Sequence, residues 1–425
     1  MSIAELYNIY TKYGSICTDT RLLKECDIFF ALKGPNFNGN TLALQALSLG
    51  ASYVVVDEAI PSNEERIIRV NDVLQTLQQL ARHHRERLKI PFLAITGSNG
   101  KTTTKELVYA VLSTTYKTYA TVGNLNNHIG VPLTILKIRA DAEIAIIEMG
   151  ANHIGEIASY CTIALPTHGL ITNCGKAHLE GFGSIEGVKK GKGELFDHLR
   201  ANNGSAFINA DDGVIKELSK SIKNIISYGT QNADTIGNVI SHESFLALEV
   251  THETGSYRIN TNLVGSYNLS NVLAAVCIGS YFKVPFEKIK HAIESYSPSN
   301  NRSQLVTKGT NRIILDAYNA NPSSMKAAIE NFAAMSGNNK VLILGSMAEM
   351  GSESRIEHQE IIEIISKYKW QSVLLVGKEF NSISHQYISM LNAGEVKEWI
   401  NKNRIANAEI LIKGSRTMGM EKVLE

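Results

Sequence analysis

The chain has 425 residues, of which 44% are hydrophobic and 20% charged, so it can bury several hydrophobic cores and form two to four domains. Its 42 Lys and Arg residues balance 41 Asp and Glu residues, which gives no reason to expect nucleic acid or an anionic membrane as the main partner. The five cysteines form no CxxC pair, no apolar run could span a bilayer, and the first residues do not resemble a signal peptide, so we expect a cytoplasmic protein without a disulfide framework or a zinc site.

Residues 1–89 are predicted to form a small α/β domain. An apolar strand is expected at residues 27–32, followed by a turn rich in Gly, Pro and Asn at residues 33–39. Apolar residues then share one helical face over residues 42–49, and residues 52–56 form another short strand.

Residues 90–299 are predicted to form a central domain with a mostly parallel sheet, because buried-type strands alternate with helical stretches. The first strand covers residues 92–96 and a helix covers residues 101–115. The later strands of this domain are expected at residues 143–148, 168–172 and 205–209. The domain ends near a linker of Ser, Pro and Asn at residues 297–301.

Residues 300–425 repeat the alternation and are predicted to form a Rossmann-like, doubly wound domain. The strands are expected at residues 312–316, 340–344, 372–376 and 409–413, with helices beginning at Pro322, at Arg355 and near Glu395. No G-x-G-x-x-G follows the first strand, so a dinucleotide is not implied.

The sequence GSNGKTT at residues 97–103 lies where a strand passes into a helix, which is the position of a phosphate-binding loop. Gly97 and Gly100 would let backbone N–H groups approach phosphate oxygens. Lys101 would reach the β- and γ-phosphates, and Thr102 would offer a hydroxyl to Mg²⁺. Ile95 replaces the first glycine of the general pattern G-x-x-x-x-G-K-[ST], and a chance Gly-rich turn is the alternative interpretation. The loop predicts ATP binding.

Three further residues follow strands or stand beside glycines. Glu148 ends its strand and could hold Mg²⁺ beside the loop, although a solvated glutamate would fit the position equally well. His178 follows another strand of the same sheet, whereas a lone histidine is more often structural. Lys192 stands between two glycines, a pattern typical of a surface residue.

Together, the loop, the IIEMG segment at residues 146–150, TNCGKAHLEGFGS at residues 172–184 and GKGELF at residues 191–196 resemble the Mur ligases. These cytoplasmic enzymes add amino acids to the UDP-sugar precursor of peptidoglycan. DAYNANP at residues 316–322 resembles the motif of the family member that adds D-alanyl-D-alanine, and so does TDTR at residues 18–21. The resemblance covers residues 16–420. The loop alone indicates only the wider superfamily, which includes folylpolyglutamate synthase.

The resemblance implies roles for individual residues. The UDP end of the substrate would be held by Thr18, Asp19, Thr20, Arg21, Lys33 and Gly34. ATP would be bound by Gly97, Ser98, Asn99, Gly100, Lys101, Thr102, Thr103, Asn271, Arg302 and Asp316. The muramoyl peptide would face Asn126 and Asn127, and the incoming dipeptide would be placed by Asn319 and Asn321. One Mg²⁺ would be bound by Thr102 and Glu148, and a second by His178 and a carbamylated Lys192. The implied catalytic residues are Lys101, His178 and Lys192.

The resemblance further implies the reaction. ATP would phosphorylate the terminal carboxylate of UDP-N-acetylmuramoyl-tripeptide, and D-alanyl-D-alanine would attack the acyl phosphate to give the pentapeptide product, ADP and phosphate. Another Mur ligase, folylpolyglutamate synthase and a nucleotide-dependent switch protein are the alternatives. A monomer is expected. Ser346, where the family usually has an acidic residue, and Met350, where it usually has Leu, bear on contacts to the dipeptide and nucleotide.

Overall fold

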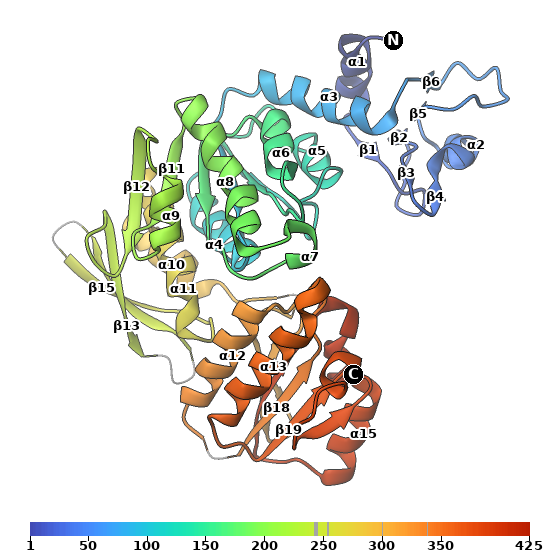
Figure 1. The fold of residues 1–425 in the computed structure, drawn as a ribbon. Coiled ribbons are helices and arrows are strands. Elements are labelled where there is room, and N and C mark those ends of the chain that lie inside the picture. The colour runs from blue at the N-terminus through green and yellow to red at the C-terminus, as the bar shows by residue number, and fades with distance from the viewer. Residues whose placement is uncertain (242–244, 253–254, 300, 338) are drawn as a thin grey trace.

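The computed structural model describes residues 1–241, 245–252, 255–299, 301–337 and 339–425 (Figure 1). Its three main sheets occupy successive stretches of the chain: four strands within residues 16–69, nine within 92–260 and six within 304–413. Most strand pairs are parallel and helices cover the sheets, so the predicted α/β class with mostly parallel sheets is confirmed. The domain boundaries stay predictions, and Asn300 of the predicted linker lies outside the described residues.

The N-terminal sheet has the strand order β1-β2-β5-β6, and all its pairs are parallel. Its strands are β1 (Ile16–Cys17), β2 (Ile28–Phe30), β5 (Tyr53–Val56) and β6 (Ile67–Arg69), and the hairpin is β3 (Lys33–Gly34) with β4 (Phe37–Asn38). The helices are α1 (Ile3–Tyr13), the 3-10 helix η1 (Gly39–Leu42), α2 (Ala43–Ser48) and α3 (Val73–Arg87). Because parallel strands end at one edge of a sheet, the segments after β1, β2 and β5 lie together there.

Helices α1 and α3 attach this unit to the central domain. The hydroxyl of Tyr10 donates to the Leu136 carbonyl, and Arg85 Nε donates to the Ala164 carbonyl at 2.8 Å. The Arg85 guanidinium also lies 3.8 Å from the centre of the Phe92 ring. Apolar residues of both units form one continuous hydrophobic core, which fixes the N-terminal unit against the central one.

The central sheet has the strand order β15-β14-β13-β12-β11-β10-β7-β9-β8, and only its last three strands in sequence pair antiparallel. Its strands are β7 (Phe92–Thr96), β8 (Thr118–Ala120), β9 (Ile144–Glu148), β10 (His168–Ile171), β11 (Ser205–Asn209), β12 (Asn224–Gly229), β13 (Thr235–Ser241), β14 (Ala247–His252) and β15 (Gly255–Asn260). Its helices are α4 (Lys101–Leu112), α5 (Gly130–Ile135), α6 (Glu156–Ala164), α7 (Leu179–Phe182), α8 (Ile185–Ala201), α9 (Gly213–Leu218), η2 (Ser266–Asn268), α10 (Leu269–Tyr281) and α11 (Phe286–Ser295).

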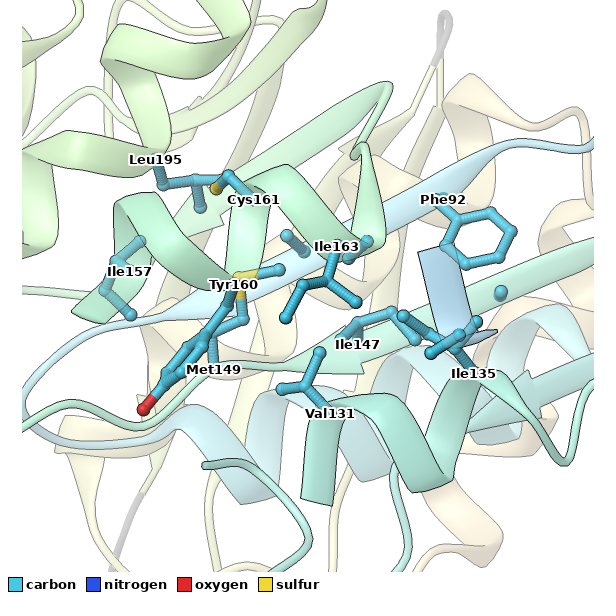
Figure 2. Close-up of a cluster of buried hydrophobic side chains, with 14 of the residues drawn as sticks. Phe92, Val131, Ile135, Ile147, Met149, Ile157, Tyr160, Cys161, Ile163 and Leu195 are labelled. Atoms are coloured by element: carbon cyan, nitrogen blue, oxygen red, sulfur yellow. The ribbon is translucent and has the colours of Figure 1, made fainter. Parts of the chain in front are cut away.

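Helices cover both faces of this sheet. On one face, side chains from β7, β9, α5, α6 and α8 pack together, among them Phe92, Ile147, Tyr160 and Leu195 (Figure 2). On the other face, α4, α10 and α11 form a second core. Helix α10 is apolar almost all round, which is typical of a helix buried between a sheet and its neighbours.

The C-terminal sheet has the strand order β16-β17-β21-β18-β19-β20, with only β16 antiparallel to its neighbour. Its strands are β16 (Gln304–Lys308), β17 (Asn311–Asp316), β18 (Lys340–Gly345), β19 (Ser372–Val376), β20 (Ile388–Met390) and β21 (Glu409–Lys413). Its helices are α12 (Pro322–Ala334), η3 (Gly351–Glu353), α13 (Ser354–Ser366), α14 (Lys378–Asn381), α15 (Ala393–Asn403), η4 (Arg416–Met418) and η5 (Met420–Leu424). Separate apolar cores on its two faces confirm the doubly wound arrangement. In the described part of the chain, no helix is long and apolar enough to cross a membrane.

Candidate active site

The carboxyl ends of parallel strands from two sheets meet at one cavity of about 880 Å³, between the central and C-terminal domains. The central domain contributes the segments after β7, β9 and β10, and the C-terminal domain those after β17, β18 and β21. Ligands of α/β proteins bind at such strand ends. The cavity is lined by these residues predicted from the sequence: Ser98, Asn99, Gly100, Lys101, Thr102, Thr103, Asn126, Asn127, Glu148, His178, Asn271, Arg302, Asp316, Asn319 and Asn321.

The phosphate-binding loop depends on its two glycines. Gly97 has a φ of 142° and Gly100 a φ of 80°, both in the region that side chains disfavour. A Cβ at Gly97 would lie 2.0 Å from Thr172 Oγ1, and a Cβ at Gly100 would lie 2.6 Å from Asn271 Oδ1. Glycine is therefore required at both positions, because the backbone angles and the neighbouring side chains leave no room for a Cβ. Residues 98–100 line the cavity, where a phosphate could approach the loop.

Lys101 folds back over this loop. Its Nζ donates to the carbonyls of Gly97 and Ser98, the latter at 3.2 Å. Burial lowers the pKa of Lys101 to about 8, opposed by the nearby charge of Glu148 and assisted by that of Arg302. The ammonium is thus poised in a low-dielectric site where an anionic phosphate would stabilise its charge.

Glu148 at the end of β9 has oxygens suited to a magnesium ion. Its side chain is 1% exposed, and its Oε1 accepts from Asn126 Nδ2 at 2.8 Å and from Thr102 Oγ1 at 3.2 Å. Its Oε2 has no hydrogen-bond partner among the described residues and lies 3.7 Å from Lys105 Nζ. A hydroxyl beside a buried carboxylate with an unpartnered oxygen fits the hard oxygen donors that Mg²⁺ prefers.

His178 and Lys192 occupy different environments. His178 lines the cavity with a left-handed backbone (φ 53°), and its Nδ1 faces the Glu349 carboxylate of the C-terminal domain. Lys192 is 1% exposed on α8, outside the cavity lining, and its Nζ donates to the Ala151 carbonyl at 2.9 Å. Burial, with a further contribution from the charge of Lys101, lowers the pKa of Lys192 to about 7. The interpretation of Lys192 as a surface residue, drawn from its position between two glycines, is therefore wrong.

Arg302, Asp316 and Asn271 approach the loop from other segments. The Arg302 guanidinium stacks on Tyr318 at 3.6 Å from the ring centre. Asp316 accepts from the Ser303 N–H at 3.0 Å and pairs with the buried Lys413. Asn271 Oδ1 accepts from the Thr104 hydroxyl at 3.0 Å, and its Nδ2 donates to Asn268 Oδ1 at 2.8 Å. These residues border the loop on the sides that face α10 and β17.

Asn321 joins the two domains at the loop. Its Nδ2 donates to Asn99 Oδ1 at 2.8 Å, while its Oδ1 accepts from the Ser324 N–H and caps α12. Both hydrogen-bonding groups of this amide are thus engaged, one across the domain interface and one within α12. Asn319 is exposed and lines the cavity. A second link between the domains is the ion pair of Lys176 with Glu357 at 2.8 Å.

The predicted uridine-binding residues lie apart from the cavity lining, at the carboxyl edge of the N-terminal sheet. Arg21 pairs with Asp19 through Nε and Nη2, and Lys33 pairs with Asp57 at 3.0 Å. Thr18, Thr20 and Gly34 belong to the same two segments after β1 and β2.

Comparison with known proteins assigns the chain to a family. Residues 95–279 match the Mur ligase middle domain, and residues 301–415 match the Mur ligase glutamate ligase domain. The UDP-N-acetylmuramoyl-tripeptide–D-alanyl-D-alanine ligase of Bacillus subtilis is 34% identical over 98% of this chain and 93% of that protein. The corresponding Escherichia coli ligase is 36% identical over 99% of this chain and 95% of that protein.

The chain belongs to the Mur ligase family. A crystal structure of MurF from Acinetobacter baumannii superposes with a TM-score of 0.89 at 29% identity, covering 96% of this chain and 92% of the other. MurF ligase from Thermotoga maritima in complex with ADP gives a TM-score of 0.86 at 27% identity, covering 96% of each chain. Folylpolyglutamate synthase from Thermotoga maritima, at 11% identity and a TM-score of 0.62, shares the fold alone. The family assignment from the sequence is confirmed.

This Mur ligase also has cavity residues that the sequence did not point out, namely Lys413, Arg416, Tyr318 and Glu349. Lys413 ends a predicted strand, so its position at the carboxyl edge could have been derived from topology. Glu349 has a left-handed backbone (φ 62°), which no local pattern indicated. The two departures from the family pattern, Ser346 and Met350, are buried outside the cavity lining, and Ser346 Oγ donates to the Val376 carbonyl at 3.1 Å.

Proposed function

We propose that this Mur ligase joins D-alanyl-D-alanine to the terminal carboxylate of UDP-N-acetylmuramoyl-tripeptide, with cleavage of ATP to ADP and phosphate. The observation that carries the proposal is the phosphate-binding loop, facing Glu148 of the same sheet and Arg302 of the C-terminal domain across one cavity. The named D-alanyl-D-alanine ligases, matched over nearly the whole chain, support the choice of substrates.

The chemistry needs the γ-phosphoryl group because carboxylate oxygen is a poor leaving group. Transfer of that group to the tripeptide carboxylate gives an acyl phosphate, which the dipeptide amine attacks, and the tetrahedral intermediate collapses to amide and phosphate. Lys101 would neutralise charge on the β- and γ-phosphates, and Arg302 would approach the same anion from the other domain. Positioning two anions together is the main task of these residues.

Thr102 and Glu148 would hold one Mg²⁺ through the hydroxyl and the unpartnered carboxylate oxygen. When bound, that ion supplies further charge neutralisation at the phosphates. Lys192 would serve a second ion only after carbamylation, since an ammonium cannot bind a cation. Its lowered pKa supports this proposal, because CO₂ adds to the neutral amine.

Domain contact would protect the acyl phosphate from water. The bridges Asn99–Asn321 and Lys176–Glu357 connect the central and C-terminal domains next to the loop. A closed interface excludes water and favours attack by the amine over hydrolysis. The edge of the N-terminal sheet with Arg21 and Lys33 is proposed to hold the UDP end of the substrate. We place the reaction in the cytoplasm and expect a monomer.

An ADP-release assay tests the proposal. The purified enzyme is incubated with ATP, Mg²⁺ and UDP-muramoyl-tripeptides that end in either meso-diaminopimelate or lysine, each with D-alanyl-D-alanine, D-alanine or L-glutamate as the acceptor. Sustained ADP turnover is expected only with a tripeptide and the D,D-dipeptide together, and the preferred tripeptide identifies the third residue. Multiple-turnover ADP formation that does not depend on the dipeptide would contradict the proposal.

The carbamate has its own test. Lys192→Ala should lose activity, and acetate or formate at high concentration should restore part of it, because a small carboxylate can take the place of the carbamate. Lys190→Ala, at an exposed position on the same helix, is the control and should keep full activity. A fully active Lys192→Ala enzyme would remove this lysine from the site.

A further inference from the structure

The cavity contains one arginine that the proposed mechanism does not use. Four Lys and Arg residues line it: Lys101, Arg302, Lys413 and Arg416. Lys413 is neutralised by Asp316. Lys101 and Arg302 lie close enough to influence each other electrostatically beside the loop, where the phosphates would bind. Arg416 remains, exposed in the cavity and without a carboxylate partner among the described residues.

The surroundings of Arg416 belong to the C-terminal domain. It lies just after β21, and its guanidinium is 5.6 Å from the centre of the Tyr318 ring, whose segment follows the neighbouring strand β17. Arg302 stacks on the same ring at 3.6 Å. Tyr318 therefore contacts both guanidinium groups and can hold Arg416 at the cavity edge through a cation–π contact.

The charges of the three substrates leave one group without a partner. The phosphates of ATP meet Lys101 and Arg302, and the tripeptide carboxylate must lie at the γ-phosphate in order to react. The dipeptide has an amine, which must stay neutral to attack, and a terminal carboxylate, which loses water on entering the cavity. A desolvated carboxylate needs a cationic, hydrogen-bonding partner, and a guanidinium can bind it through two parallel N–H···O bonds.

We propose that Arg416, held by Tyr318, binds the terminal carboxylate of the incoming dipeptide. This assignment rests on the proposed function and gives the dipeptide an orientation: its carboxylate lies at the β17–β21 edge and its amine points toward the loop. Asn319, exposed in the same cavity, lies one residue from Tyr318 and borders this position. A charge-assisted bond of this kind selects acids over amides, so it determines specificity as well as affinity.

The test pairs a change in the enzyme with a change in the ligand. KM and kcat are measured for D-alanyl-D-alanine and for its C-terminal amide, in the wild type and in Arg416→Ala. The wild type should prefer the acid by about 10- to 100-fold in kcat/KM, and the variant should lose that preference because its KM for the acid rises by a similar factor. The KM values for ATP and for the UDP-tripeptide should stay within about threefold.

Four further variants separate positioning from folding. Tyr318→Phe keeps the aromatic face and should behave as the wild type, whereas Tyr318→Leu should raise the dipeptide KM by about two- to fivefold. Arg355→Ala, an exposed arginine of the same domain outside the cavity lining, is the control. Arg416→Lys keeps the charge and should retain part of the acid preference.

Failure of this inference can be told apart from failure of the proposed function. A wild type that does not use D-alanyl-D-alanine overturns the proposed function itself. An active wild type whose Arg416→Ala variant still prefers the acid over the amide overturns only the role of Arg416. A variant whose KM rises for ATP or for the UDP-tripeptide instead of the dipeptide assigns Arg416 to that substrate and equally overturns the inference.

Discussion

Lys192, to which we assign a role in the proposed reaction, should destabilise the folded state of this enzyme. Its amine is buried beside Phe182, with Nζ 5.0 Å from the ring centre, and it donates to the Ala151 carbonyl. Lys192→Met keeps a flexible, unbranched side chain, one atom shorter, that can pack against the ring, but it removes the ammonium. We expect this variant to be inactive and, near neutral pH, more stable than the wild type.

The size of the effect follows from the pKa. Burial lowers the pKa of Lys192 from 10.5 to about 7. Between pH 7 and pH 10.5 the unfolded chain therefore binds more protons than the folded one. The resulting loss in the free energy of unfolding is complete below pH 7 and vanishes as the pH rises toward 10.5. The difference between the two pKa values corresponds to about 5 kcal/mol. Loss of the donor to Ala151 costs about 1–3 kcal/mol in return. The net stabilisation should be about 2–4 kcal/mol at pH 6.5 and close to zero at pH 9.

Urea unfolding at the two pH values measures this difference. Both tryptophans, Trp370 and Trp399, lie in the C-terminal domain, so far-UV circular dichroism is the better probe of the central domain. Buffers depleted of CO₂ keep the amine unmodified. Lys190→Met provides the exposed control on the same helix and should change little at either pH. A Lys192→Met variant less stable than the wild type at pH 6.5, or a difference that does not shrink by pH 9, would refute the reasoning.

Three further changes test the loop and the domain contact. Lys101→Met should lower ADP release at least about 100-fold while the protein stays folded, and near-normal turnover would contradict its role. Gly100→Ala should abolish nucleotide binding in calorimetry, because its Cβ would collide with Asn271 Oδ1, and wild-type affinity would show that the loop adapts. Asn321→Asp keeps the cap of α12 but loses the donor to Asn99, so kcat should fall without a drop in thermal stability; an unchanged kcat would separate this contact from turnover.

Strands and the phosphate loop were predictable because their signals are local. Residues 92–96, 205–209, 372–376 and 409–413 are apolar runs between polar turns, and each forms a strand with those bounds in the structure. The Gly97–Gly100 turn is likewise local, since its glycines and lysine follow one strand directly. The antiparallel strands β13–β15 were missed, because partly exposed strands at the sheet edge lack a continuous apolar run.

The other half of the site could not be predicted from spacing. Glu349 faces His178 across the domain interface, and Lys413 pairs with Asp316 of the neighbouring strand, through contacts across 171 and 97 residues of sequence, so only the folded chain brings these groups together. The family resemblance named His178 and Asp316 but said nothing of what neutralises them. Such partners depend on strand order within a sheet and on where two sheets direct their strand ends, which are properties of the assembled fold.

The contact between Asn99 and Asn321 has a consequence for how the two halves work together. Asn99 belongs to the loop that would bind phosphate, and Asn321 of the YNANP motif caps α12 in the domain that we propose to bind the dipeptide. Any shift of the loop on binding phosphate must therefore lengthen or shorten a hydrogen bond to the other domain. Since Arg302 and Arg416 both contact Tyr318, three residues earlier in that motif, the proposed nucleotide and dipeptide sites share one short segment. In the proposed reaction, this segment would align the amine with the acyl phosphate only when both domains are in contact.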